Sequence, residues 1–558
     1  MNPAPLTHAE HGPVAGGPVS RATRASLSHP LIRFGPTLPD ELEALLVPEA
    51  LAFLAELEIR FGPRRLALLR QRGGVRERWR RGLAPGFLPE TAVCRSSDWA
   101  VVAPPSDLRD RRVEITGPTQ RRMMIHALNS GASVYMADFE DAHSPTWEGT
   151  IRGQANLRDA VRRRLEDLDP DGGSLRLHAR TATLMVRPRG WHLTEDHMTV
   201  EGFPISASLF DFGLFAFHNA EELLRRGSGP YLYLPKIEHH EEARLWNDVF
   251  EATEAALVLP TGSIRAAVLI ETFPAVFQMD EILYALRERS LGLNSGRWDY
   301  LFSFIKQFRD DPRFVLPDRR ALTMETPFLD AYARALVATC HRREAYAIGG
   351  MAADVPVKAD PDRNAAALSR VRADKEREVS IGYDGTWVAH PALVEVARQA
   401  FDGTMRGDHQ IDRKLALPPD LATELLRVPS GRVTEAGIRS NVRATLAYLS
   451  AWLNGSGAVA IDGRMEDAAT VEISRAQLWQ WVRYGVPLAD GPRVTVALFR
   501  ALVDEESIRL SAAEPTGERP RESLRRAREI IDAVVVDPEF VDFVTLAAYP
   551  ALRLLEGS

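Results

Sequence analysis

Eight short runs of apolar and aromatic residues, spaced along the middle of the chain, constrain the fold most strongly. Most are nearly continuous, which is typical of parallel strands covered on both faces. Helical patterns such as QRRMMIHALNSG and PAVFQMDEILYALRERS separate them. Eight strands over about 280 residues predict an α/β protein with a (β/α)₈ barrel, whose active site lies at the carboxyl ends of the strands. An open doubly wound sheet is the alternative that periodicity alone does not reject. The runs are VEITG (113–117), SVYMADF (133–139), TLMVRP (183–188), YLYLPKI (231–237), AAVLIET (266–272), DYLFSF (299–304), AYAIGG (345–350) and GTWVAH (385–390).

The regions on either side of these runs have different patterns. Residues 1–35 are rich in Pro, Gly, Ala and Ser and lack periodicity, which predicts a disordered tail. Residues 36–95 contain apolar residues at helical spacing in DELEALL, EALAFLAELEIRF and RRLALLRQR. The predicted barrel spans 96–402. After residue 402 the strand signal disappears, and 403–558 is predicted to form a separate helical domain.

Composition excludes several classes of function. Lys+Arg 69 against Asp+Glu 76 gives 69 − 76 = −7, so no net basic charge favours nucleic acid as a partner. The two cysteines, Cys94 and Cys340, are too few for a disulfide framework or a cysteine zinc site. No apolar run approaches the length of a membrane span. We therefore expect a cytoplasmic enzyme or binding protein with no membrane partner; the sequence has no signal for an oligomeric state.

Polar side chains cluster where the predicted strands end. Glu271 ends the fifth strand and Asp299 opens the sixth, a separation of 299 − 271 = 28 residues, about one βα unit. Two carboxylates that converge from neighbouring strands suit Mg²⁺, which is bound through one or two carboxylates. Carboxylates at strand ends also cap helices or pair with arginine. The residues favour this structural interpretation and the metal site about equally.

Two further residues allow a structural and a functional interpretation. Arg187 ends the third strand, where it either forms an ion pair with nearby acids or stabilises charge that develops on an oxygen atom. Asp467 precedes a run of small residues in MEDAATVEISRAQLWQW, so the simplest interpretation is a helix cap. The residues alone leave both pairs of alternatives open.

Several long segments, taken together, resemble the malate synthase family, in its shorter A type. These segments run in the same order from about residue 90 to the C-terminus, and together they are highly specific. In this family an N-terminal helical clasp and a C-terminal helical plug flank a (β/α)₈ barrel. Arg464, directly before MEDAA, stands where the resemblance predicts an apolar residue. The segments are FEDAHSPTWEG, GQANL, VRPRGWHL, YLPKIEHHEEA, IETFPAVFQMDEILYALRERSLGLNSGRWDYLFSFIK, IGGMAA and MEDAATVEISRAQLWQW.

The resemblance implies a reaction and a set of site residues. The reaction is the condensation of acetyl-CoA with glyoxylate and water to give (S)-malate and CoA, with Mg²⁺ as cofactor. The metal carboxylates fall on Glu271 and Asp299, the catalytic arginine on Arg187 and the catalytic base on Asp467. The acidic motif of the second strand falls on Asp138 and Glu140, which would support the waters of the metal. The CoA moiety is expected near Pro145 and the face of the plug.

Two other functions are kept as alternatives. One is a Mg²⁺-dependent lyase of the malyl-CoA or citramalyl-CoA type, which has the same constellation and leaves the CoA thioester intact. The C-terminal MEDAA region argues against it, because such lyases are much shorter. The other is a non-catalytic binding protein that keeps the fold. It would be favoured by loss of Arg187, Glu271, Asp299 or Asp467, and all four are present.

Overall fold

The computed structural model describes residues 32–34, 38–169, 171–356, 360–489, 491–513 and 517–556. Its centre is a closed barrel of eight parallel strands, ordered β10-β11-β12-β13-β2-β3-β6-β9. This confirms the predicted barrel and excludes the open sheet. The apolar side chains of the strands fill the interior, including Met136, Met185 and Leu269. The strands are β2 (Val113–Pro118), β3 (Val134–Asp138), β6 (Thr183–Arg187), β9 (Tyr231–Leu234), β10 (Arg265–Ile270), β11 (Ser290–Ser295), β12 (Ala347–Ala352) and β13 (Gly385–Val388).

The prediction for the sixth strand was wrong. Residues 299–304 lie in a helix, α10 (Arg297–Phe308), and the strand is the preceding segment Ser290–Ser295. Every residue of α10 from Asp299 onward is buried, so its apolar pattern does not distinguish a helix from a strand. The true strand includes Gly292, at φ +97°. A Cβ at this position would lie 2.1 Å from the carbonyl oxygen of Tyr346, which directly precedes the adjacent strand β12. The close backbone approach therefore requires a glycine in a segment that is poor in β-formers.

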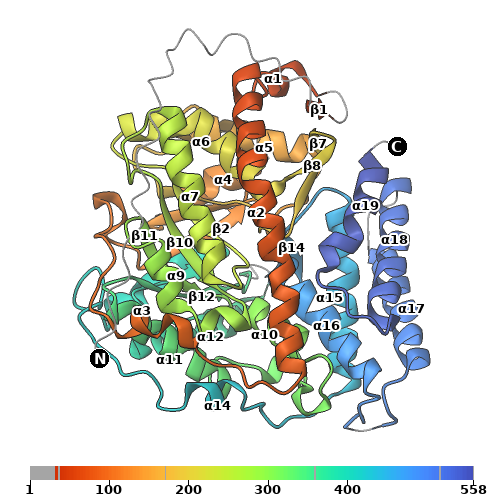
Figure 1. Ribbon diagram of the computed structural model, residues 1–558. Helices are drawn as coiled ribbons and strands as arrows, with labels where there is room; N and C mark the ends of the chain where they lie inside the picture. The colour runs from red at the N-terminus through yellow and green to blue at the C-terminus, as the bar shows by residue number, and fades with distance from the viewer. Residues whose placement is uncertain are drawn as a thin grey trace, which may run out of the picture.

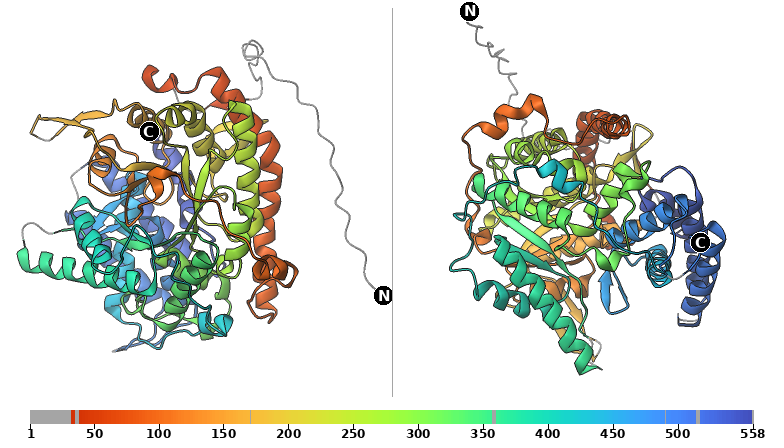
Figure 2. Two further views of the ribbon diagram at one scale, coloured as in Figure 1. Left: turned by 90° about the vertical axis from the view of Figure 1, so that its left-hand side faces the viewer. Right: turned by 90° about the horizontal axis from the view of Figure 1, so that it is seen from below.

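Helices surround the barrel, as its architecture requires (Figures 1 and 2). A small sheet also lies on its outer side, in the order β1-β7-β8, with strands β1 (Ile32–Phe34), β7 (Thr194–Val200) and β8 (Phe203–Ser206). The helices that follow the barrel strands are α4 (Arg121–Leu128), α5 (Trp147–Val161), α6 (Ala207–Arg225), α7 (His240–Leu257), α8 (Phe273–Val276), α9 (Met279–Ala285), α10, α11 (Pro327–Arg342), α12 (Pro361–Ile381) and α13 (Val394–Asp402).

The N-terminal region is dominated by one long helix. The helical patterns of residues 39–81 form α1 (Asp40–Glu43) and α2 (Pro48–Arg80), and α2 runs along the side of the barrel against α6 and α7 (Figure 1). The predicted tail at 1–35 lies outside the described residues except for 32–34, which form β1 and pair with β7. That short segment is thus a strand and not part of a tail.

The C-terminal region is mainly helical, as predicted, and has its own apolar core (Figures 1 and 2). A short hairpin of β14 (Val459–Ile461) and β15 (Arg464–Glu466) interrupts the helices, contrary to the expected absence of strands. No helix among the described residues is long and apolar enough to span a bilayer. The helices are α14 (Leu421–Leu425), α15 (Glu435–Leu453), α16 (Ala468–Arg483), α17 (Val496–Ala513), α18 (Glu518–Val536) and α19 (Val544–Glu556).

Candidate active site

Three buried carboxylates converge at the carboxyl ends of the barrel strands. Asp141 lies in the loop after β3, Glu271 directly follows β10, and Asp299 lies in the first turn of α10, after β11. Their side chains each offer an oxygen within 4.8 Å of the others. Glu271 and Asp299 thus adjoin one another from neighbouring strands, as their spacing predicts. Asp141 completes the trio, and Asp138 and Glu140, which were expected to support the waters of the metal, lie outside it.

Lys236 lies among these acids. Its ammonium nitrogen is 3.0 Å from Glu140 Oε1, 3.2 Å from Asp141 Oδ2 and 3.0 Å from Asp299 Oδ2. Lys236 follows β9 in a left-handed conformation, φ +54°, and its backbone N–H donates to Glu271 Oε1 at 2.7 Å. Burial opposes the charge of the ammonium group, but the surrounding carboxylates raise the Lys236 pKa well above its usual value. One cation therefore faces four acids.

The negative charges of the four acids exceed the single positive charge of Lys236. Burial is the main cause that raises the pKa of Asp299 well above its usual range, and Asp141 and Glu271 add to the effect. Asp299 Oδ1 is buried and has no hydrogen-bond partner within the described part of the chain. A buried carboxylate oxygen without a partner is costly. The oxygen donor set and this free oxygen fit a divalent cation such as Mg²⁺.

Arg187, the last residue of β6, forms the ion pair expected from its position. Its Nε and Nη2 donate to the two carboxylate oxygens of Asp138 at 2.7 and 2.5 Å, and its Nη1 donates to Asp141 at 3.1 Å. Asp138 also accepts the backbone N–H groups of Glu140 and Ala142, both at 2.8 Å. Asp138 therefore fixes both the guanidinium and the acidic loop, and Glu140 contacts Lys236.

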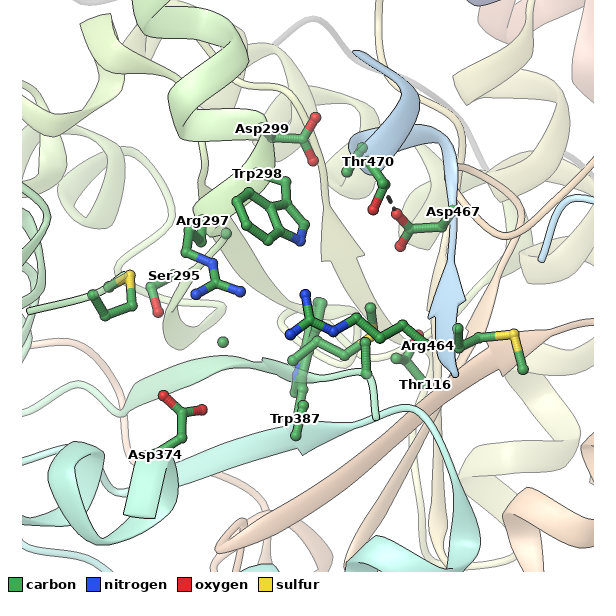
Figure 3. Close-up of a pocket in the computed structure, with 18 of the residues that line it drawn as sticks. Thr116, Ser295, Arg297, Trp298, Asp299, Asp374, Trp387, Arg464, Asp467 and Thr470 are labelled. Carbon is green, nitrogen blue, oxygen red and sulfur yellow. Dashed lines mark hydrogen bonds between the residues drawn. The ribbon is translucent and has the colours of Figure 1, made fainter. Parts of the chain in front are cut away.

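Asp467 approaches the site from the C-terminal region. It caps helix α16, and its carboxylate accepts the N–H of Thr470 at 3.4 Å (Figure 3). The capping interpretation is thus correct, but the side chain also lines the cavity that holds the acidic trio. Burial, reinforced by the charge of Asp141, raises the pKa of Asp467 to about 7. A carboxylate with this pKa accepts a proton at neutral pH more readily than an ordinary aspartate.

Asp467 lines two cavities. The larger, of about 430 Å³, has Asp141, Arg187, Glu271 and Asp299 in its lining. The smaller, of about 180 Å³, is largely apolar, and its lining includes Pro118, Met123, Ala389, Pro391, Met465 and Asp467. Pro145 lines a cavity of only about 30 Å³. The cavity next to Pro118 is therefore larger than the one at Pro145, and the expected place of the CoA moiety stays a prediction.

The structure brings all six predicted site residues to one end of the barrel. Neither Lys236 nor Asp141 was predicted from the sequence to have a role at the site. The signal for Asp141 was its place beside Glu140 in FEDAH, although the direction in which each acid points depends on the loop. Arg189, two residues after Arg187, pairs with Asp211 and Glu195.

Comparisons with known proteins match this chain to malate synthases over almost its whole length. Three family models match, described as malate synthase N-terminal domain (residues 37–93), TIM barrel domain (183–427) and C-terminal (432–552). A malate synthase of Myxococcus xanthus is 55% identical over 92% of this chain and 95% of its own length. One from Streptomyces clavuligerus is 51% identical over 94% and 98%. Malate synthase A of Escherichia coli is 46% identical over 92% and 96%.

Proposed function

The chain belongs to the malate synthase family and is an enzyme, and from this premise we propose its substrates and the roles of its side chains. The substrates are acetyl-CoA and glyoxylate, and the products are (S)-malate and free CoA. The observation that supports this most directly is Asp467. Its carboxylate, delivered by the C-terminal region, lines both the acidic cavity and the apolar cavity.

Asp141, Glu271 and Asp299 would hold a Mg²⁺ ion in this proposal. The basis is the convergence of their oxygens and the free Oδ1 of Asp299. When bound, the ion would act as a Lewis acid that polarises the carbonyl group of glyoxylate. Lys236 balances part of the negative charge of the trio and fixes Glu271 through its backbone N–H.

Asp467 removes a proton from the acetyl methyl group. Its raised pKa matches this task, because a general base works best when its pKa lies near the operating pH. Arg187 stabilises the negative charge that develops on the thioester oxygen, and Asp138 holds the guanidinium in place. The resulting carbon nucleophile attacks the aldehyde carbon of glyoxylate, and water then hydrolyses the thioester.

The apolar cavity beside Pro118 would take the extended arm of acetyl-CoA. Methionine, proline and alanine side chains dominate its lining, which suits an uncharged, flexible chain. The acetyl group would reach Asp467 from this side, and glyoxylate would approach from the acidic cavity. The two substrates would therefore meet at Asp467. A cytoplasmic location, expected from the sequence, stays a prediction.

One assay tests the proposal and separates it from the alternatives. Purified protein is incubated with acetyl-CoA and glyoxylate, with and without Mg²⁺, while free thiol is followed and the product is identified. We expect Mg²⁺-dependent thiol release with formation of malate. Formation or cleavage of malyl-CoA without thiol release would reassign the protein to the lyases. Absence of both activities would favour a binding protein.

A further inference from the structure

A further cavity of about 170 Å³ adjoins the acidic one on the side of hairpin β14–β15. It lies between this hairpin, the short 3₁₀ helix Arg319–Ala321, the first turns of α12, and α15. It shares Asp354, Arg370, Arg464 and Glu466 with the active-site cavity. Its lining has five arginines and three acids, namely Arg319, Arg320, Arg363, Arg370, Arg464, Asp354, Asp462 and Glu466.

The acids of this lining are already engaged. Asp354 pairs with Arg370 at 2.8 Å, and Asp462 pairs with Arg443, which lies outside the cavity, at 3.1 Å. Glu466 accepts the hydroxyl of Thr470 at 2.6 Å and lies 3.7 Å from the guanidinium of Arg319. After these pairings, the cavity keeps an excess of positive charge.

Arg319 shows this excess most clearly. Its side chain is only 10% exposed, and its buried Nη1 has no hydrogen-bond partner among the residues that the structure describes. The guanidinium of Arg319 also lies 3.7 Å from Glu466 and over the face of Trp298, 5.3 Å from the ring centroid. A buried guanidinium N–H without an acceptor is costly, so the geometry favours an acceptor from outside the chain.

Two more guanidinium groups face the adjoining space. Arg297 and Arg464 both point into the pocket shown in Figure 3. Arg297 lies against the ring of Trp298, 3.9 Å from its centroid. Burial lowers the pKa of Arg297 and of Arg319, and Arg464 contributes to this in both cases. Mutual repulsion among the three arginines is a cost that a bound anion would remove.

We propose that Arg319 and Arg464 bind a small dianion, a phosphate or a dicarboxylate, in the cavity beneath hairpin β14–β15. Guanidinium groups present paired N–H donors that match the oxygens of either group. The site is distinct from the acidic trio, because none of the three carboxylates lines this cavity. It requires neither thioester nor aldehyde chemistry, so its occupancy is independent of the proposed reaction.

The site has a structural consequence for the hairpin. Strand β15 contains Arg464 and leads directly into Asp467. It is held to the barrel by bonds from Met465 N–H to the Ala353 carbonyl (2.8 Å) and from Val355 N–H to the Gly463 carbonyl (2.9 Å). A dianion that bridges Arg464 to Arg319 adds a further link between the hairpin and the barrel, so its binding restrains the segment that precedes Asp467.

Calorimetric titration of the full chain in Mg²⁺, at fixed ionic strength, tests the site with two probes, inorganic phosphate and succinate. We expect at least one to bind, and Arg319→Gln and Arg464→Gln each to weaken that binding tenfold or more. The matched control is Arg313→Gln, which removes an exposed guanidinium from the same connecting segment. Glu271→Gln, which alters the acidic trio, should leave the affinity unchanged. The probe that binds identifies the class of dianion.

Hydrogen exchange provides the second measurement, should either variant fold poorly. In the unaltered chain, the binding probe should slow amide exchange in residues 459–466, with no such change from an equal concentration of chloride. The proposal is overturned if neither probe binds, or if binding persists in both arginine variants. It is also overturned if Glu271→Gln abolishes binding, because the anion then occupies the acidic site. None of these outcomes depends on turnover.

Discussion

At the scale of single residues, the active site is defined by an excess of buried negative charge. Glu140, Asp141, Glu271 and Asp299 surround the single ammonium group of Lys236. Buried charges persist only when they are paired or coordinated. Lys236 balances part of this charge, and so does Arg187, 3.1 Å from Asp141 and 3.5 Å from Glu140. The Oδ1 of Asp299 has no hydrogen-bond partner among the described residues, and a divalent cation would balance more of the charge.

Replacement of Glu271 by alanine tests this account. The variant loses one of three convergent carboxylates and the acceptor of the Lys236 N–H bond. We expect the affinity for Mg²⁺ to fall tenfold or more, together with that for glyoxylate, because the ion holds the substrate. Calorimetry with Mg²⁺ measures the first effect, and the exposed Glu288→Ala is the control. An unchanged Mg²⁺ affinity would contradict the assignment of Glu271.

Replacement of Asp467 by asparagine separates the base from the metal site. The amide keeps the shape of the side chain but does not accept the proton, so turnover should fall by about 10² to 10⁴. Mg²⁺ binding should persist, because the three carboxylates belong to the barrel. Asp462→Asn, on the turn of the same hairpin, should leave turnover close to that of the unaltered enzyme. Normal turnover in Asp467→Asn would exclude this residue as the base.

The pH dependence of the rate follows from the raised pKa of Asp467. A carboxylic acid whose pKa is about 7 becomes increasingly protonated as the pH falls below that value, and the base is lost. We expect kcat/KM at saturating Mg²⁺ to fall about tenfold per pH unit on the acidic side of neutrality. A profile that stays flat down to pH 5 would show that the reactive carboxylate has an ordinary pKa.

At the scale of elements, the sequence predicts best where a segment has one exposed face or a clear breaker. Seven of the eight predicted strand runs overlap barrel strands, because each is short, apolar and bounded by turn residues. The prediction of a strand at residues 299–304 was wrong because α10 is buried on all sides, between the barrel and α16. In such a segment the pattern of apolar and polar residues does not distinguish a helix from a strand. The true strand, SLGLNS, lacks the apolar density that marks the other strands.

The site shows the same division. The positions of Glu271 and Arg187 were predictable, because strand ends of a barrel meet at one face. The place of Asp141 in the acidic trio was not, since it depends on the loop after β3. There Asp138 accepts two backbone N–H groups and turns toward Arg187. Local loop geometry of this kind leaves no periodic signal in the sequence.

Helix α2 supports the site through one buried arginine. Arg72 donates to both carboxylate oxygens of Glu242, each at 2.7 Å, and to the carbonyl oxygen of Lys236 at 2.8 Å. Arg72→Met should lower the free energy of unfolding by about 3–5 kcal/mol, because Glu242 is left buried and unpaired. Urea unfolding followed by tryptophan fluorescence measures this, and Arg70→Met, on the same helix, is the control. Equal losses in the two variants would refute a specific role for Arg72.

At the scale of the whole molecule, the proposed metal ligands and the proposed base belong to different regions. The acidic trio lies on the barrel, and Asp467 lies between the C-terminal hairpin and α16. Two bonds join these regions next to the site: the Ala468 N–H (3.1 Å) and the Tyr448 hydroxyl (3.0 Å) both donate to the Asp141 carbonyl. The order of the three regions along the chain was predictable from their patterns. Their docking was not, because it depends on side chains brought together from distant segments.

This division predicts that loosening the interface impairs turnover and spares metal binding. Gln480, buried on α16, accepts the N–H of Leu316 at 3.0 Å and donates to the Phe314 carbonyl at 2.9 Å, both in the segment after α10. Gln480→Met removes both bonds and keeps the apolar volume. Because small displacements of a reacting group are costly, kcat should fall tenfold or more.

The Mg²⁺ affinity of this variant should stay unchanged, since Gln480 lies far along α16 from Asp467 and touches none of the three carboxylates. Gln399→Met, on the outer helix α13, is the matched control and should alter neither quantity. The measurements are kcat at saturating substrates and the calorimetric Kd for Mg²⁺. A parallel loss of both would mean that the C-terminal region shapes the metal site itself. An unchanged kcat would mean that Asp467 is held by the hairpin and not by the docking of α16.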